Sequence, residues 1–140
     1  MNQPVVVDSF ALVSLFHREP GWEKVRDIFR DLSSSGEKAL LCRMNWGEFY
    51  YIVRRRVGGL KTRETLALLD QLPVKILSVD DELVREAAEI KAEYPLSFSD
   101  AFCIATARRA NGQILTGDPE FKPVEGLVPI LWLGGRVPKK

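Results

Sequence analysis

The chain has 140 residues and a mass of 15.8 kDa, which is the length of one ordinary domain. Hydrophobic residues make up 46% and charged residues 28%, a balance typical of a soluble globular protein and not of a disordered or fibrous one. Lysine and arginine number 20 against 19 acidic residues, so a nucleic acid or a membrane would have to be bound by a local patch of charge. We therefore expect residues 1–140 to form a single domain.

Several classes of protein are disfavoured by what the sequence lacks. Two cysteines, Cys42 and Cys103, are too few for a disulfide framework and do not have the spacing of a metal site. With His17 as its one histidine, the chain is a poor candidate for chemistry that needs histidine clusters or a His–Cys pair. Its apolar runs are too short to cross a bilayer, and the N-terminus has no features of a secretion signal. We expect a cytoplasmic protein without membrane contact.

The order of the predicted elements indicates an α/β domain, because short β-branched runs alternate with longer segments of helical period. In chain order we predict a strand at 4–7, a helix opened by Asp8 and Ser9, a helix from 22 to about 32, a strand at 39–42, helices at about 45–57 and 61–72 separated by Gly58 and Gly59, a strand at 74–77, helices from 80 to about 94 and at 98–110, and strands at 113–116 and 128–132. Pro129 places the last strand at an edge. The prediction is a five-stranded, mainly parallel sheet flanked by helices.

Four acidic residues stand behind the predicted strands or in the first turns of helices. Asp8 follows the first strand directly, and Asp118 follows the fourth after Gly117. Glu48 and Asp100 lie near the starts of their helices. Ligands of open parallel sheets bind beyond the carboxyl ends of the strands, where the connections switch direction. We therefore expect the four carboxylates to meet in one crevice.

Each of these acids also has a purely structural interpretation. Asp8 can cap the first helix, and Asp118 before a proline is an ordinary turn residue. Asp100 stands three positions after Ser97, which is the spacing of a capping box. A carboxylate in any one of these places is therefore weak support for a functional site.

Glu48 is the hardest of the four to explain by local structure. It too stands at capping-box spacing, three positions after Asn45. However, no base lies three or four positions from it on the helix, and it falls on an apolar stripe. A carboxylate in such a place needs a compensating partner, and a metal ion is one.

Four converging carboxylates would raise one another's proton affinity, and a divalent cation relieves this repulsion. Oxygen ligands suit Mg²⁺ or Mn²⁺ rather than Zn²⁺. A cation held there would attract a phosphodiester and lower the proton affinity of water, so that no nucleophilic side chain is needed. The residues themselves thus point to metal-dependent cleavage of a phosphodiester.

Four stretches carry a resemblance to a known family, and they are Val5-Val6-Val7-Asp8-Ser9, Asn45-Trp46-Gly47-Glu48-Phe49, Ser97-Phe98-Ser99-Asp100-Ala101-Phe102-Cys103-Ile104-Ala105-Thr106-Ala107 and Ile114-Leu115-Thr116-Gly117-Asp118-Pro119-Glu120-Phe121. In this order, and over nearly the whole chain, the sequence resembles the PIN-domain family. Within it the chain is most similar to the small VapC-type toxins of type II toxin–antitoxin pairs. The last two stretches are the most specific, whereas an aspartate after a strand is common.

The resemblance implies a three-layer PIN-like domain that acts as a Mg²⁺-dependent endoribonuclease, with Mn²⁺ able to substitute. The residues that it assigns to metal binding and catalysis are Asp8, Glu48, Asp100 and Asp118. The hydroxyl groups of Ser9 and Thr116 resemble positions that support the neighbouring acids. The implied partners are an RNA substrate and a cognate antitoxin that silences the toxin, and the implied assembly is a homodimer or a hetero-oligomer with the antitoxin.

A run of basic residues without an intervening acid lies between residues 54 and 63, and its members are Arg54, Arg55, Arg56, Lys61 and Arg63. Because the overall charge is near zero, this run is the best candidate for contact with an RNA backbone. The alternative is that these cations complement the negative end of a helix dipole and remain solvated.

Other functions use a similar α/β sheet. An aspartate-nucleophile phosphatase needs a second acid two residues after Asp8, where this chain has Phe10, and the lysine and acceptor aspartate of a receiver domain are not convincing here. A PIN-type nuclease of RNA processing, or a non-catalytic module that binds RNA or a partner, would keep the same fold. Specific uptake of Mn²⁺ separates the nucleases from the binding module.

Overall fold

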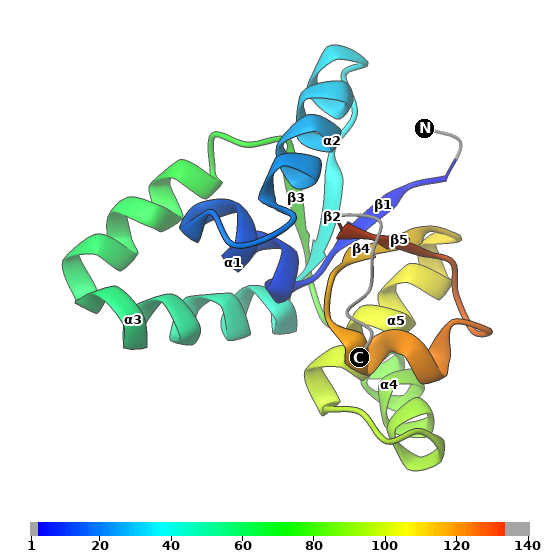
Figure 1. Ribbon diagram of the computed structural model, residues 1–140. Coiled ribbons are helices and arrows are strands. Elements are labelled where there is room, and N and C mark those ends of the chain that lie inside the picture. Colours follow the sequence, from blue (N-terminus) through cyan, green and yellow to red (C-terminus); the bar gives the residue numbers. More distant parts are fainter. Residues whose placement is uncertain (1–2, 134–140) are drawn as a thin grey trace.

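The computed structural model describes residues 3–133. Its five strands form one parallel sheet in the order β3-β2-β1-β4-β5, with helices on both faces (Figure 1). The strands are β1 (Val5–Val7), β2 (Ala39–Cys42), β3 (Val74–Leu77), β4 (Gln113–Thr116) and β5 (Ile130–Trp132). The predicted α/β class and its parallel five-stranded sheet are confirmed.

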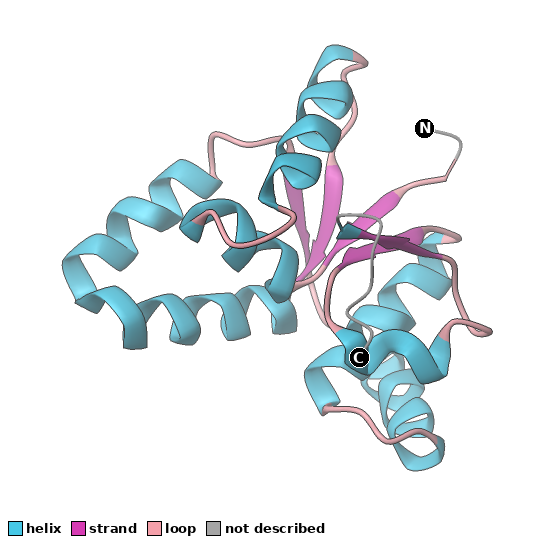
Figure 2. Cartoon of the chain, in the orientation of Figure 1, coloured by secondary structure: helices cyan, strands magenta, loops and turns pink. Residues whose placement is uncertain are grey.

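Two groups of helices cover the sheet, one on each face (Figure 2). The first group is α1 (Ser9–His17), α2 (Trp22–Ser34) and α3 (Arg43–Leu69). The second is α4 (Asp81–Glu93) and α5 (Phe98–Ala110), followed by the short 3-10 helix η1 (Pro119–Val124). No helix among residues 3–133 has both the length and the apolar character that crossing a bilayer requires.

The side chains of β1 alternate between two hydrophobic cores. Val5 and Val7 pack with α1, α2 and α3, whereas Val6 packs with α4 and α5. All three valines are fully buried, because a central parallel strand is covered on both faces. This explains why β1 is a continuous apolar run and not an alternation of apolar and polar residues.

The direction in which the chain travels across the sheet reverses at β1. From β1 the chain moves outward to β2 and β3, returns to β4 on the other side of β1, and then continues to β5. Val7 pairs with Leu115, so the carboxyl ends of β1 and β4 lie side by side. Asp8 and Asp118 therefore leave the sheet at adjoining points, at the switch point where open α/β sheets bind ligands.

The predicted break of the helix at Gly58 is confirmed in α3. We expected two helices separated by Gly58 and Gly59, with the first starting near residue 45, and α3 is two helices joined at a kink at Gly58, whose φ of 84° and ψ of 173° a residue with a side chain rarely adopts. The difference from the prediction is that the first helix begins at Arg43. The helix resumes directly after Gly58, and the Thr62 hydroxyl donates to the Gly58 carbonyl at 2.7 Å across the kink.

Candidate active site

Asp8 lies at the carboxyl end of β1 and both caps α1 and faces β4. Its Oδ1 accepts a 2.9 Å hydrogen bond from the backbone N–H of Ala11, so the structural interpretation of this residue is correct. Its Oδ2 accepts a 2.6 Å bond from the hydroxyl of Thr116, and that hydroxyl also accepts the backbone N–H of Asp118 at 3.0 Å. Asp8 therefore caps α1 and is also linked through Thr116 to Asp118, another of the predicted acids.

Asp100 and Asp118 come together from α5 and from the end of β4. Ser97 caps α5 by accepting the Asp100 N–H at 3.1 Å, as predicted. Asp118 caps η1 through the N–H of Glu120 at 2.9 Å. One carboxylate oxygen from each of Asp100, Asp118 and Glu120 lies within 4.8 Å of the other two.

Glu48 reaches the same place from α3 and is held by two hydroxyl groups. Its Oε1 accepts hydrogen bonds from Ser9 at 2.6 Å and from Ser99 at 3.1 Å. The capping-box interpretation of Glu48 is wrong, because α3 starts two residues before Asn45, with Cys42 at its N-cap. Asn45 instead donates to the carbonyl of Ser99 at 2.9 Å, which ties α3 to α5.

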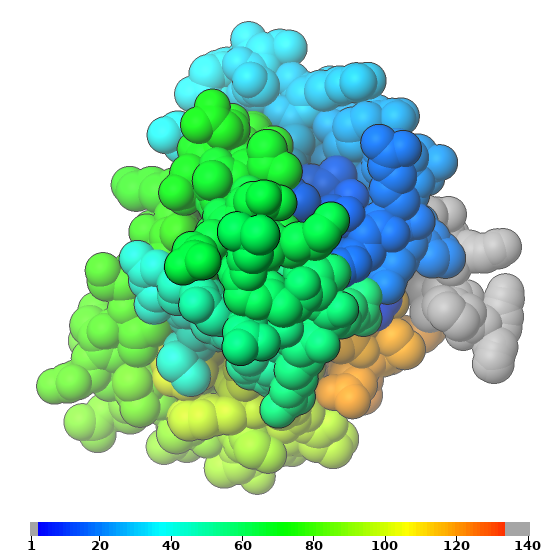
Figure 3. Space-filling model, turned by 90° about the vertical axis from the view of Figure 1, so that its left-hand side faces the viewer, coloured from blue at the N-terminus to red at the C-terminus, as the bar shows by residue number. Residues whose placement is uncertain are grey.

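These acids surround an open pocket of about 320 Å³, whose lining residues are Ser9, Phe10, Val13, Glu19, Glu48, Ile52, Arg56, Ser97, Asp100, Asp118 and Glu120. Figure 3 shows the face on which α3 lies at the centre, with the α1–α2 segment in blue to its upper right and the η1 segment in orange to its lower right. Asp8 is only 1% exposed and lies behind the pocket lining. Three of the four predicted acids thus face the pocket, and the fourth supports it from inside.

Burial and mutual repulsion raise the pKa values of two of the acids. Burial is the main cause that raises the pKa of Asp8 to about 8, and the charges of Asp100 and Asp118 add to it against the lowering effect of its two hydrogen bonds. Burial also raises the pKa of Asp100 to about 7, with the charges of Asp118 and Glu48 adding to it. Near neutral pH the cluster therefore binds protons that a cation could displace.

The donor set fits a hard divalent cation. The pocket offers carboxylate and hydroxyl oxygens, and none of the described residues that line it is a histidine or a cysteine. Oxygen ligands of this kind are typical of Mg²⁺, Mn²⁺ and Ca²⁺. Asp100, Asp118 and Glu120 are close enough together to share one ion, and the charges of Asp8 and Glu48 act on the same cluster.

Glu120 and Ser99 are residues of the site that were not predicted from the sequence. Glu120 stands two residues after Asp118 in a turn that contains a proline, and this spacing was the available signal. Ser99 directly precedes Asp100, but its contact with Glu48 depends on how α3 packs against α5. The predicted supporting hydroxyls, Ser9 and Thr116, do contact acids of the site.

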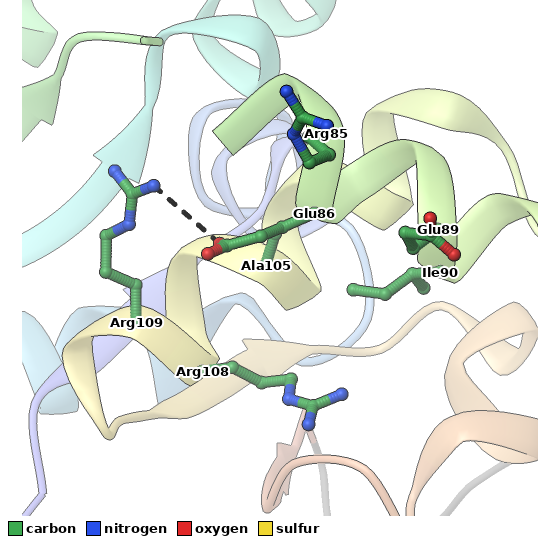
Figure 4. Close-up of a pocket in the computed structure, with 7 residues that line it drawn as sticks. All are labelled: Arg85, Glu86, Glu89, Ile90, Ala105, Arg108 and Arg109. Carbon is green, nitrogen blue, oxygen red and sulfur yellow. Dashed lines mark ion pairs between the residues drawn. The ribbon is translucent and has the colours of Figure 1, made fainter. Parts of the chain in front are cut away.

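A second pocket, of about 420 Å³, lies between α4 and α5 and contains none of these acids (Figure 4). Its charged residues are Arg85, Glu86, Glu89, Arg108 and Arg109. Arg109 pairs with Asp80 at 3.0 Å and with Glu86 at 3.7 Å, and the first contact lowers the pKa of Asp80. Asp80 also caps α4 through the Leu83 N–H, so local structure explains this acid completely.

Comparison with solved structures confirms the fold. The VapBC2 structure from Rickettsia felis, bound to a DNA fragment from its promoter, matches with a TM-score of 0.76 and 12% identity over 92% of this chain and 98% of that chain. The DNA-bound VapBC from Salmonella typhimurium matches with a TM-score of 0.71 and 17% identity, over 92% of this chain and 97% of that chain. VapC20 of Mycobacterium tuberculosis, a toxin that cleaves the sarcin–ricin loop, matches with a TM-score of 0.64 and 20% identity, over 86% of this chain and 94% of that chain.

Comparison at the level of sequence identifies the family. No curated protein matches the chain. The family model for the PIN domain matches residues 5–127, which include all four predicted acids and Glu120. Together with the parallel sheet and its acidic switch point, this match means that the chain belongs to the PIN domain family.

Proposed function

We propose that this protein is a divalent-metal-dependent endoribonuclease that acts as the toxin of a toxin–antitoxin pair. The observation that carries the proposal is the convergence, at the switch point of the sheet, of acids from four separate elements. These acids are Asp8, Glu48, Asp100 and Asp118. Membership of the PIN domain family supports it.

Each acid has a distinct place in the proposed metal site. Asp100 and Asp118 would hold the cation from the lining of the pocket, Glu48 would approach it from α3, and the buried Asp8 would add negative charge. When bound, Mg²⁺ or Mn²⁺ supplies the positive charge that attracts a phosphodiester and lowers the pKa of water. The Ser9 hydroxyl holds the Glu48 carboxylate in position.

The proposed reaction is hydrolysis of an RNA phosphodiester. The oxygen of a water molecule bonds to phosphorus, the bond from phosphorus to the ribose 3′ oxygen breaks, and that oxygen takes a proton. The products are a 5′-phosphate and a 3′-hydroxyl. Among the described lining residues there is no histidine, cysteine or lysine, and the hydroxyl groups of Ser9 and Ser97 are engaged with Glu48 and with the N-cap of α5, which agrees with water as the nucleophile.

Support for the substrate and the partners comes from similar proteins. VapC20 of Mycobacterium tuberculosis cleaves the sarcin–ricin loop, which is RNA, and a structure from Klebsiella pneumoniae is a toxin–antitoxin complex. We therefore propose RNA as the substrate and a cognate antitoxin as the partner. We also propose one catalytic domain over residues 1–140 that acts in the cytoplasm as a homodimer or in a hetero-oligomer with the antitoxin.

Cleavage of RNA by the purified chain tests the enzymatic part of the proposal. We expect cleavage with Mg²⁺ or Mn²⁺, no cleavage with EDTA, and loss of cleavage in Asp100→Asn. Asp81→Asn is the matched control, because Asp81 is an exposed acid in the first turn of α4, outside the pocket. Cleavage that persists in a folded Asp100→Asn variant would contradict the proposal.

Expression in cells tests the toxin part. We expect induction of the chain to arrest growth, and co-expression of the product of an adjacent antitoxin gene to restore it. RNA cleavage in vitro without growth arrest would favour a PIN-type nuclease of RNA processing. Absence of both Mn²⁺ uptake and cleavage would favour a non-catalytic binding module.

A further inference from the structure

One basic residue of the 54–63 run belongs to the acidic pocket. Arg56 is the only cation among the described residues that line it. Glu48, Ile52 and Arg56 follow one another at four-residue intervals on α3, so they form one stripe that faces the pocket. At a rise of 1.5 Å per residue, the backbones of Glu48 and Arg56 are about 12 Å apart along the helix.

A carboxylate holds Arg56 at the rim of the pocket. Arg56 Nη1 donates to Glu19 Oε2 at 2.7 Å. Glu19 is itself fixed between α1 and α2, because its N–H donates to the Ser14 carbonyl and its carbonyl accepts the Trp22 N–H, both at 3.0 Å. This contact ties the guanidinium to another residue of the pocket lining.

The ion pair is weak enough to be exchanged for another anion. The side chains of Arg56 and Glu19 are 43% and 41% exposed, and exposed pairs contribute little net free energy. A phosphate group accepts two hydrogen bonds from a guanidinium in the same planar geometry as a carboxylate. The Glu19 carboxylate therefore occupies the position that a phosphate would take.

An RNA strand needs such a contact, because the rest of the pocket repels it. Glu48, Asp100, Asp118 and Glu120 are all acidic, and a metal ion among them compensates only the phosphate that it touches. We propose that Arg56 binds a backbone phosphate flanking the reactive one, in exchange for Glu19. This inference rests on the proposed ribonuclease activity and assigns one substrate contact within it.

The other arginines next to Arg56 have different surroundings. The guanidinium of Arg55 lies 5.0 Å from the centre of the Tyr51 ring, and neither Arg54 nor Arg55 lines the pocket. The inference therefore concerns one residue and not the whole basic run. A suitable control is Arg30, an exposed arginine of α2 that also lies outside the pocket lining.

The test is the steady-state cleavage of a single-stranded RNA by the full chain at several salt concentrations. We expect Arg56→Ala to raise KM about tenfold with little change in kcat, because loss of one phosphate contact weakens binding by this amount. The slope of log KM against log salt should fall by about 0.7. Arg56→Lys should keep the slope and raise KM less, and Arg30→Ala should match the wild type.

Glu19→Gln tests the exchange itself. Removing the competing carboxylate should lower KM by up to about fivefold. Unchanged Mn²⁺ affinity and thermal stability in Arg56→Ala would show that the metal site and fold are intact. If the wild type cleaves RNA but Arg56→Ala has the KM of Arg30→Ala, or a higher KM with an unchanged salt slope, this inference is overturned and the proposed function stands. A wild type that does not cleave RNA overturns both.

Discussion

Thr116 donates a 2.6 Å hydrogen bond to Asp8, from the end of β4 to the end of β1. The same hydroxyl accepts the N–H of Asp118 at 3.0 Å. One small side chain thus links two acids of the candidate site across neighbouring strands. It also lowers the pKa of Asp8 against the larger effect of burial.

Replacing this hydroxyl tests its role. Thr116→Val keeps the shape of the side chain but leaves the Asp118 N–H without its partner and removes a donor from Asp8. We expect it to lower the free energy of unfolding by about 1–3 kcal/mol. It should also weaken Mn²⁺ binding about tenfold or more, as the loss of partners that orient metal ligands does.

Urea denaturation and calorimetric titration with Mn²⁺ measure these two effects. Thr116→Ser should keep the free energy of unfolding and the Mn²⁺ affinity near those of the wild type, because it keeps the hydroxyl group. Thr65→Val is the control, since the Thr65 hydroxyl bonds only to the Lys61 carbonyl on the exposed side of α3 among the contacts of the described chain. Equal Mn²⁺ affinities in Thr116→Val and Thr65→Val would contradict the assignment.

Glu120 should contribute to metal binding, although no strand or long helix contains it. Its carboxylate oxygen lies within 4.8 Å of those of Asp100 and Asp118. We expect Glu120→Gln to reduce the affinity for Mn²⁺ about tenfold in a titration followed by electron paramagnetic resonance. Glu93→Gln, at the end of α4, is the control. If the two variants bind Mn²⁺ with the same affinity, Glu120 is excluded as a ligand.

The stability of the metal-free protein should fall as pH rises. The pKa values of Asp8 and Asp100 are raised from 3.8 to about 8 and about 7, so between these limits the folded state binds more protons than the unfolded state. Their stabilising contribution is complete below about pH 4 and is lost as pH rises to about 8.

Thermal unfolding in EDTA over this pH range provides the measurement. Asp8→Asn should flatten the decline, because asparagine does not titrate and still caps a helix. A Tm difference between Asp8→Asn and the wild type that does not change with pH would mean that Asp8 does not titrate as described.

Much of the fold could be predicted because the strands and most of the helix ends are encoded locally, whereas the order of the strands in the sheet came only from the structure. The valines of β1 and the Ser97 cap are visible in the sequence, and parallel strands necessarily bring their carboxyl ends to one edge. Asp8 and Asp118 were therefore expected at the same edge, and they come close together because β1 and β4 are neighbours in the sheet. The start of α3 could not be predicted, since nothing in the local sequence around Cys42 distinguishes its cap.

The contacts between distant side chains could not be predicted. Ser99 reaches Glu48 only because α3 packs across the start of α5, and Arg56 meets Glu19 only because α3 lies beside the α1–α2 connection. These separations along the chain exceed anything that helical or strand periodicity describes. Sequence patterns thus located four of the acids and the hydroxyl groups of Ser9 and Thr116, but not Glu120, Ser99 or the pair of Arg56 with Glu19.

The interruption of α3 should depend on a single glycine. Gly58→Ala should lower the free energy of unfolding by about 1–3 kcal/mol, because the φ of 84° and ψ of 173° at this residue strain any side chain. Gly59→Ala is the matched variant, with helical backbone and only an ordinary contact of its Cβ with the Arg54 side chain at 3.7 Å, and it should be neutral or stabilising by about 0.5–1 kcal/mol. Equal effects of the two substitutions in urea denaturation would contradict this account of the bend.

The most direct test of the metal-dependent nuclease is to measure Mn²⁺ binding and RNA cleavage in the same titration. We predict that the cleavage rate rises in proportion to occupancy of the site, saturates with it, and yields 5′-phosphate ends. Both signals should be lost in Asp100→Asn and kept in Asp81→Asn. Cleavage that precedes metal binding, or that continues in EDTA, would contradict a metal-dependent ribonuclease built on these acids.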